Sequence, residues 1–178
     1  MKLAPARTGN MNSFRFGDAV IERARNLDHC SCLGLDPHLS MIPSAFRRGD
    51  MKAGSFATIN TIEDFLVAVI DQAVDRVAAF KPQSAMYERL GSASIALLER
   101  LAPMPMDAVA LFCSMRSAGT LPRRRMPTHR PISRWTACLT VNPCMGLDTI
   151  EPYLRLSQQF GKGVFAVLRT SNPGAGAF

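Results

Sequence analysis

No aspartate or glutamate occurs between Ala108 and Leu147, and this absence is the most unusual feature of the chain. The same stretch holds six arginines, and without them the formal net charge of +7 falls to +1. The positive charge is therefore local. The sequence also lacks an apolar run of the ~20 residues that a membrane span requires, and no apolar segment follows Met1 to Asn10 as in a secretory signal. These absences predict a cytoplasmic protein without membrane contact.

The cysteines favour neither a disulfide framework nor a zinc site. Their number is odd and no secretory signal accompanies them. His29-Cys30-Ser31-Cys32 does not have the usual zinc spacing, and no matching second pair follows. We expect Cys30 and Cys32 to alternate on a buried strand as small apolar residues. The five cysteines are Cys30, Cys32, Cys113, Cys138 and Cys144.

Apolar periodicity predicts one α/β domain over residues 14–178, preceded by a tail at 1–13. Strands are expected at His29–Leu35, Val77–Lys81, Ala108–Cys113, Ala137–Val141 and Gly163–Leu168. Helices are expected at Phe16–Leu27, from a capping box at Thr61 onward, at Ser92–Leu101 and at Thr149–Phe160. Residues 114–135 show neither period and are expected to be irregular. Alternating strands and helices indicate parallel βαβ units.

Polar residues follow the expected strands at the points where the strands end. They are Asp36, Lys81, Asn142, Arg169 and Ser171. Each alone is typical of a turn or a helix cap. In a (β/α) barrel, however, the carboxyl ends of all strands meet at one rim, where sites are built. Their shared placement therefore favours a functional site at that rim.

An ordered set of short motifs resembles orotidine 5'-phosphate decarboxylase, in its longer bacterial-type subgroup. The motifs are Phe16-Gly17-Asp18, Gly34-Leu35-Asp36-Pro37-His38, Phe80-Lys81-Pro82-Gln83-Ser84-Ala85, Leu139-Thr140-Val141-Asn142-Pro143, and Gly161-Lys162-Gly163 through Arg169-Thr170-Ser171-Asn172-Pro173-Gly174. The resemblance implies a TIM barrel, normally a homodimer. It implies a carboxy-lyase that converts orotidine 5'-phosphate to uridine 5'-phosphate in de novo pyrimidine biosynthesis, with neither a metal nor an organic cofactor.

The resemblance assigns roles to three residues of this sequence. Lys81 matches the second-strand lysine of the catalytic charge array. Asp36 matches the aspartate that hydrogen-bonds the ribose, and Ser171 matches the serine that reads the pyrimidine ring. Asn142 matches only as part of a rim motif. In such a site a fixed lattice of charges favours the anionic transition state over the substrate.

The family's third-strand motif, Asp-Ala-Lys-Arg-Gly-Asp, is absent. After Phe112 the chain reads Cys113-Ser114-Met115-Arg116-Ser117, and Lys81 is the only lysine between Lys52 and Lys162. The family's C-terminal phosphate grip is absent as well, and the chain supplies roughly six of the eight barrel strands. We therefore expect an incomplete barrel that is inactive as written and poorly soluble or dependent on a partner.

A shifted reading frame is a hypothesis that explains the missing motif. Codons permitted for Phe112 to Thr136, read from the third base of Phe112, can encode Leu-Leu-Asp-Ala-Lys-Arg-Gly-Asp at the expected place. The same shift accounts for the lost periodicity, the missing acids and the local arginines. The original frame would return near Cys138.

Two other functions remain open from the residues alone. Arginines within 116–134 are typical of phosphate contacts in a nucleic-acid-binding module, although only Trp135 is nearby for stacking. They are Arg116, Arg123, Arg124, Arg125, Arg130 and Arg134. A different phosphate-binding TIM barrel would place Asp36, Lys81 and Ser171 similarly.

The frame hypothesis predicts a specific DNA sequence. Sequencing codons 105–140 should find bases that encode the third-strand motif in the shifted frame. An unambiguous read in which those codons do not encode the motif would end the hypothesis.

Overall fold

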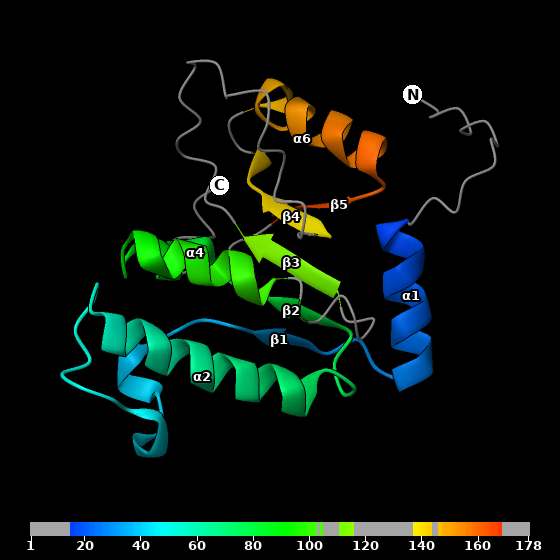
Figure 1. Cartoon of the computed structure of the whole chain (residues 1–178). Coiled ribbons are helices and arrows are strands. Elements are labelled where there is room, and N and C mark those ends of the chain that lie inside the picture. The colour runs from blue at the N-terminus through cyan, green and yellow to red at the C-terminus, as the bar shows by residue number, and fades with distance from the viewer. Residues whose placement is uncertain (1–14, 103, 105–110, 116–136, 144–145, 169–178) are drawn as a thin grey trace, which may run out of the picture.

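The protein forms a five-stranded parallel sheet flanked by helices (Figure 1). The computed structural model describes residues 15–102, 104, 111–115, 137–143 and 146–168, with the backbone alone for 111–115. The tail expected at 1–13 lies outside these residues. The strands are β1 Cys32–Gly34, β2 Ala79–Lys81, β3 Leu111–Met115, β4 Cys138–Val141 and β5 Gly163–Ala166. The α/β class expected from the alternating pattern is confirmed.

The strands lie side by side in chain order, β1-β2-β3-β4-β5, and every neighbouring pair is parallel. All five strands therefore end at the same edge of the sheet. The expectation of about six strands concerned the whole chain; the described residues contain five. That expectation came from the chain length, whereas the apolar segments themselves number five.

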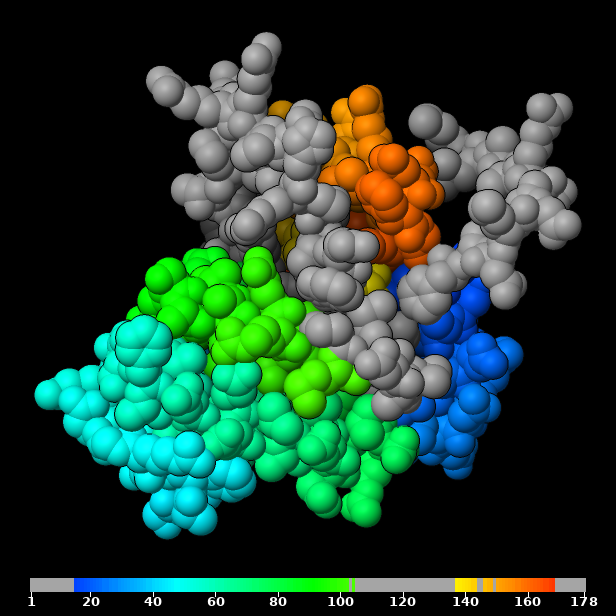
Figure 2. Space-filling view, viewed as in Figure 1, coloured from blue at the N-terminus to red at the C-terminus, as the bar shows by residue number. Residues whose placement is uncertain are grey.

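Helices account for most of the described residues outside the strands. They are α1 Phe16–Leu27, α2 Phe56–Ala73, α3 Ser84–Glu88, α4 Ser92–Leu101 and α6 Leu147–Phe160, with two 3₁₀ turns, η1 Leu39–Met41 and η2 Ser44–Phe46. The bounds expected for α1 and α4 are confirmed, whereas α3 had not been expected. None of these helices combines the length and the apolar character that crossing a bilayer demands. In the space-filling view, the segment with the 3₁₀ turns lies against α2 at one corner (Figure 2).

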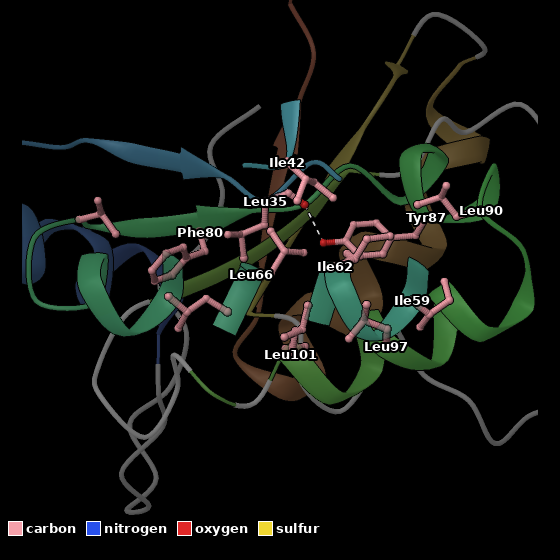
Figure 3. Close-up of a cluster of buried hydrophobic side chains, with 13 residues drawn as sticks. Leu35, Ile42, Ile59, Ile62, Leu66, Phe80, Tyr87, Leu90, Leu97 and Leu101 are labelled. Atoms are coloured by element: carbon pink, nitrogen blue, oxygen red, sulfur yellow. Dashed lines mark hydrogen bonds between the residues drawn. The ribbon is translucent and has the colours of Figure 1, made fainter. Parts of the chain in front are cut away.

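The main core lies between β1, β2 and the helices α2 and α4 (Figure 3). Leu35, which directly follows β1, and Phe80 of β2 are both fully buried. Helix α2 contributes residues at helical spacing, including Ile62 and Ile70, and α4 contributes Leu97. Burial of each such side chain stabilises the fold by ~1.5–3 kcal/mol. The first half of the chain therefore holds together through local βα packing.

Helix α1 covers the edge where the strands begin. Phe16 packs with Ala79 and Cys138 in a second buried cluster, and the Phe16 amide donates to the Gly161 carbonyl at 3.1 Å. Arg23 anchors the same helix near the start of β2, because its Nε donates to the Val77 carbonyl at 3.0 Å. The start of α1 is thereby tied to β5, and its middle to β2.

Two local expectations were wrong. Helix α2 begins at Phe56, not at Thr61, and the Thr61 hydroxyl is buried, where it accepts a hydrogen bond from the Arg48 amide at 3.1 Å. Cys30 and Cys32 are exposed rather than buried. Within the described residues β1 is an edge strand, and Leu33 and Leu35 point from it toward the helical core. Cys32, on the opposite face of β1, is exposed.

The prediction of an irregular segment at 114–135 was also wrong for its first two residues. Ser114 and Met115 belong to β3, paired with Leu139 and Thr140 of β4. Strand β4 supplies ladder partners for both residues, so this backbone is extended although its sequence lacks a strand period. The rest of the predicted irregular segment, 116–135, lies outside the described residues.

The contact between α1 and β5 gives a stability prediction. A Cβ added at Gly163 would overlap the ring of Phe16, whereas a Cβ at Gly17 would meet no atom within 4 Å. Gly163→Ala should therefore lower the free energy of unfolding by ~1–3 kcal/mol through overpacking. Gly17→Ala, inside α1, should raise it by up to ~1 kcal/mol.

Urea unfolding of both variants and the parent checks this expectation. Equal midpoints for Gly163→Ala and the parent would show that Phe16 does not occupy the space beside Gly163.

Candidate functional site at the carboxyl edge of the sheet

Asp36 and Lys81 come together at the edge where the strands end. Lys81 is the last residue of β2 and lies opposite Gly34 of β1 in the parallel register. The Leu35 amide then donates to the Lys81 carbonyl at 3.3 Å, which continues the ladder one residue beyond β1. Asp36 follows immediately, and both side chains are half-buried. The register thus puts an acidic and a basic side chain on neighbouring strand ends.

The Asp36 carboxylate is held from the β2 side. The backbone amide of Gln83 donates to Asp36 Oδ1 at 2.8 Å. Gln83 precedes the first residue of α3, so the carboxylate lies at the start of that short helix. Hydrogen bonds to an ionised acceptor are stronger than neutral ones. This bond ties the turn after β1 to the turn after β2.

Tyr87 forms a hydrogen bond to Leu35, the residue before Asp36 (Figure 3). The phenol lies fully buried and donates to the Leu35 carbonyl at 2.6 Å. Burial, and secondarily the negative charge of Asp36, raises the pKa of Tyr87 well above its ordinary value. The phenol therefore stays protonated as a hydrogen-bond donor throughout the neutral range.

The other residues predicted at the strand ends are only partly described. Asn142 directly follows β4 at the same edge and is exposed. Arg169 and Ser171 lie outside the described residues. Lys162 is a further candidate for a functional site, because burial lowers its pKa. It precedes β5, however, and so lies at the opposite edge, where the strands begin.

Within the described part of the chain, neither a metal cluster nor the apolar groove on α2 coincides with this edge. Among the described residues no three histidine, cysteine or acidic side chains lie close enough together to hold a metal ion. An open apolar groove of about 460 Å³ runs along the outer face of α2, between Phe46, Phe65 and Arg76. Apolar side chains dominate its lining, so it offers little to a polar substrate. The strand ends remain the better candidate site.

Sequence reasoning had not assigned roles to Gln83 or Tyr87. The contribution of Gln83 is its backbone amide, which no side-chain pattern reveals. Tyr87 does carry a signal, since a tyrosine inside an apolar segment usually requires a partner for its hydroxyl. The partner itself, the Leu35 carbonyl, depends on the fold.

Comparison with known proteins identifies the relatives of this chain. It is 34% identical over 161 residues to an orotidine 5'-phosphate decarboxylase of Clostridium tetani, a match that covers 89% of this chain and 54% of the relative. It is 32% identical over 163 residues to that of Streptomyces coelicolor, covering 89% of this chain and 56% of the relative. Over most of its length the chain is therefore similar to orotidine 5'-phosphate decarboxylases. No protein-family model matches it.

Solved structures show the same similarity. A Streptomyces avermitilis protein, assigned as an orotidine 5'-phosphate decarboxylase, superposes with a TM-score of 0.75 at 27% identity, covering 97% of this chain and 59% of that one. Leishmania donovani OMP decarboxylase shares the fold, with a TM-score of 0.68 at 24% identity over 92% of this chain and 57% of that one. The chain thus spans little more than half the length of these relatives.

The comparisons also bear on the two other functions considered from sequence. They favour the decarboxylase family over another phosphate-binding barrel. No match supports a nucleic-acid-binding module, and the arginines that suggested one, within 116–134, lie outside the described residues.

The buried phenol predicts an alkaline change in stability. Because the folded state raises the pKa of Tyr87, the unfolded chain releases this proton first, above the ordinary value of 10.0. The resulting stabilisation is fully present below that pH and is lost as the pH rises toward the folded pKa. Tyr87→Phe should lower the free energy of unfolding by ~1–3 kcal/mol at pH 7, because the Leu35 carbonyl loses its donor. The variant should also show a shallower loss above pH 10.

Chemical unfolding of the parent and Tyr87→Phe at pH 7, 9 and 11 provides the measurement. Parallel stability curves for the two proteins would contradict the raised pKa.

Proposed function

We propose that the protein to which this chain belongs decarboxylates orotidine 5'-phosphate to uridine 5'-phosphate, as a carboxy-lyase of pyrimidine biosynthesis. The observation that carries the proposal is the placement of Asp36 and Lys81 at the ends of adjacent parallel strands. These two residues occur in a chain 34% identical to a decarboxylase over 89% of its length. The proposal includes no metal and no organic cofactor.

The sheet is proposed to form part of the wall of a (β/α)₈ barrel. Parallel strands in unbroken chain order are typical of a barrel, whereas doubly wound sheets reverse the strand order. Further strands would close the gap between β5 and β1. They would also cover apolar side chains that are now exposed, such as Leu147 and Phe165. As in the family, we propose a homodimer.

Each site residue has a proposed role. Lys81 supplies fixed positive charge beside the carbon that loses carbon dioxide, where negative charge develops in the transition state. The Asp36 carboxylate accepts hydrogen bonds from the ribose hydroxyls, and Ser171 reads the pyrimidine ring. Hydrogen bonds far from the reacting carbon supply binding energy that orients the substrate.

The chain as written is proposed to lack the catalytic step. The register aligns Phe80 with Phe112, so the residues that follow Phe112 lie next to Lys81 on the neighbouring strand. In the family this position carries the aspartate and the proton-donating lysine. Here the sequence continues with Cys113-Ser114-Met115, and no lysine occurs between Lys81 and Lys162. Binding of the nucleotide without decarboxylation is the expected behaviour.

Calorimetric titration with uridine 5'-phosphate tests the proposed site. Lys81→Ala should weaken binding by about tenfold to a hundredfold, because a hydrogen bond to a charged group contributes ~1.5–3 kcal/mol. Lys52→Ala is the matched control, since Lys52 is exposed and pairs only with nearby Asp50 in the described contacts. It should bind like the parent.

Release of carbon dioxide from orotidine 5'-phosphate is measured in the same samples. The chain as written should release no more than Lys81→Ala. Equal affinities of the parent and Lys81→Ala for uridine 5'-phosphate would overturn the proposed site, and release above the Lys81→Ala level would overturn the proposed loss of the catalytic step.

A further inference from the structure

Two hydrogen bonds from one short segment converge on the end of β1. Gln83 lies just before α3, and Tyr87 lies within it. The Gln83 amide donates to the Asp36 carboxylate at 2.8 Å, and the Tyr87 hydroxyl donates to the Leu35 carbonyl at 2.6 Å. The segment 83–87 therefore contacts both the side chain of Asp36 and the peptide bond that leads into it.

We propose that Tyr87 is a positioning residue that fixes the direction of the Asp36 carboxylate. The inference rests on the proposed function, in which that carboxylate binds the ribose. Tyr87 itself is fully buried behind the strand end and acts through Leu35 and Asp36. It is not proposed to touch the substrate.

The geometry explains how a buried phenol orients a carboxylate. The Leu35 carbonyl belongs to the planar peptide unit that ends at the Asp36 nitrogen. A hydrogen bond to this oxygen fixes the plane and so limits the backbone rotation that aims the Asp36 side chain. The Gln83 amide then fixes one carboxylate oxygen, Oδ1. The second oxygen, Oδ2, remains an acceptor site that can be directed at a ribose hydroxyl.

The neighbouring packing makes this arrangement rigid. Pro37, Pro82 and Ser84 are buried on either side of the contacts, and the Leu90 amide donates to the Tyr87 carbonyl at 3.0 Å. The two prolines restrict the backbone of both turns. Positioning of a binding group within about 0.5 Å generally needs such a supporting shell. Tyr87 is the member of this shell whose hydroxyl can be removed while its ring is kept.

Hydrogen–deuterium exchange of the Gln83 amide tests the proposal without any ligand. The variants are Tyr87→Phe, Asp36→Ala and, as a matched control, Tyr153→Phe, which alters the other tyrosine of the chain in α6. The Gln83 amide should exchange about tenfold faster in Tyr87→Phe and in Asp36→Ala, because its acceptor is displaced or removed. Tyr153→Phe should leave the rate unchanged.

A second measurement asks whether the carboxylate is aimed at the ribose. Affinities are compared for uridine 5'-phosphate and its 2',3'-dideoxy analogue, which lacks both hydroxyls. The parent and Tyr153→Phe should prefer the ribonucleotide, by about tenfold. Tyr87→Phe should lose most of that preference while its affinity for the dideoxy analogue is unchanged. A role limited to core packing would instead change both affinities together.

The outcomes separate this inference from the proposed function. Parental exchange at Gln83 in Tyr87→Phe, or in Asp36→Ala, would overturn the positioning role. A parent chain that binds neither nucleotide would count against the proposed function, and the exchange rates would still decide whether Tyr87 positions Asp36.

Discussion

The parallel pairing of β1 with β2 is the constraint on which the rest of the structure depends. It aligns Gly34 with Lys81 and so brings two segments 47 residues apart, Gln83 and Asp36, into hydrogen-bond contact. The same pairing presents Leu35 and Phe80 to one face, where α2 and α4 cover them. Core packing and site geometry therefore follow from one register. A slip by one residue would turn Lys81 into the core and Phe80 out of it.

The buried polar groups of this region differ in whether they have hydrogen-bond partners. Most of the core is apolar, yet the hydroxyls of Thr58 and Ser94 are buried without a hydrogen-bond partner among the described residues. Each such hydroxyl costs ~1–3 kcal/mol. Tyr87 differs because its buried hydroxyl is satisfied and lies beside the candidate site. The Asp36 carboxylate, at the same strand ends, has a hydrogen-bond partner as well.

The second half of the described chain is more exposed than the first. Leu147, Phe165 and Leu168 all retain large accessible surfaces around α6 and β5. A parallel sheet normally has both faces covered, because its strands are joined by helices that pack on them. Within the described residues, this exposed surface lies beside β5, an edge strand of the sheet.

The sequence by itself determined most of the elements and the resemblance to the decarboxylases. The periodicity of α1 and α4 and the five apolar strand segments could be predicted because local burial imposes periods of 3.6 and 2. The polar residues after β1, β2 and β4 could be predicted as well. The positions of Asp36 and Lys81 at one edge also followed, since parallel strands end together. The tertiary structure alone decided which groups meet there. The Gln83 amide and the Leu35 carbonyl are backbone groups, which no side-chain pattern reveals. Strand β3 extends to Met115 because its last residues pair with β4. Cys32 is exposed because none of the described residues covers that face of β1. Contacts between residues far apart in the chain depend on register and on packing, which local sequence patterns do not encode.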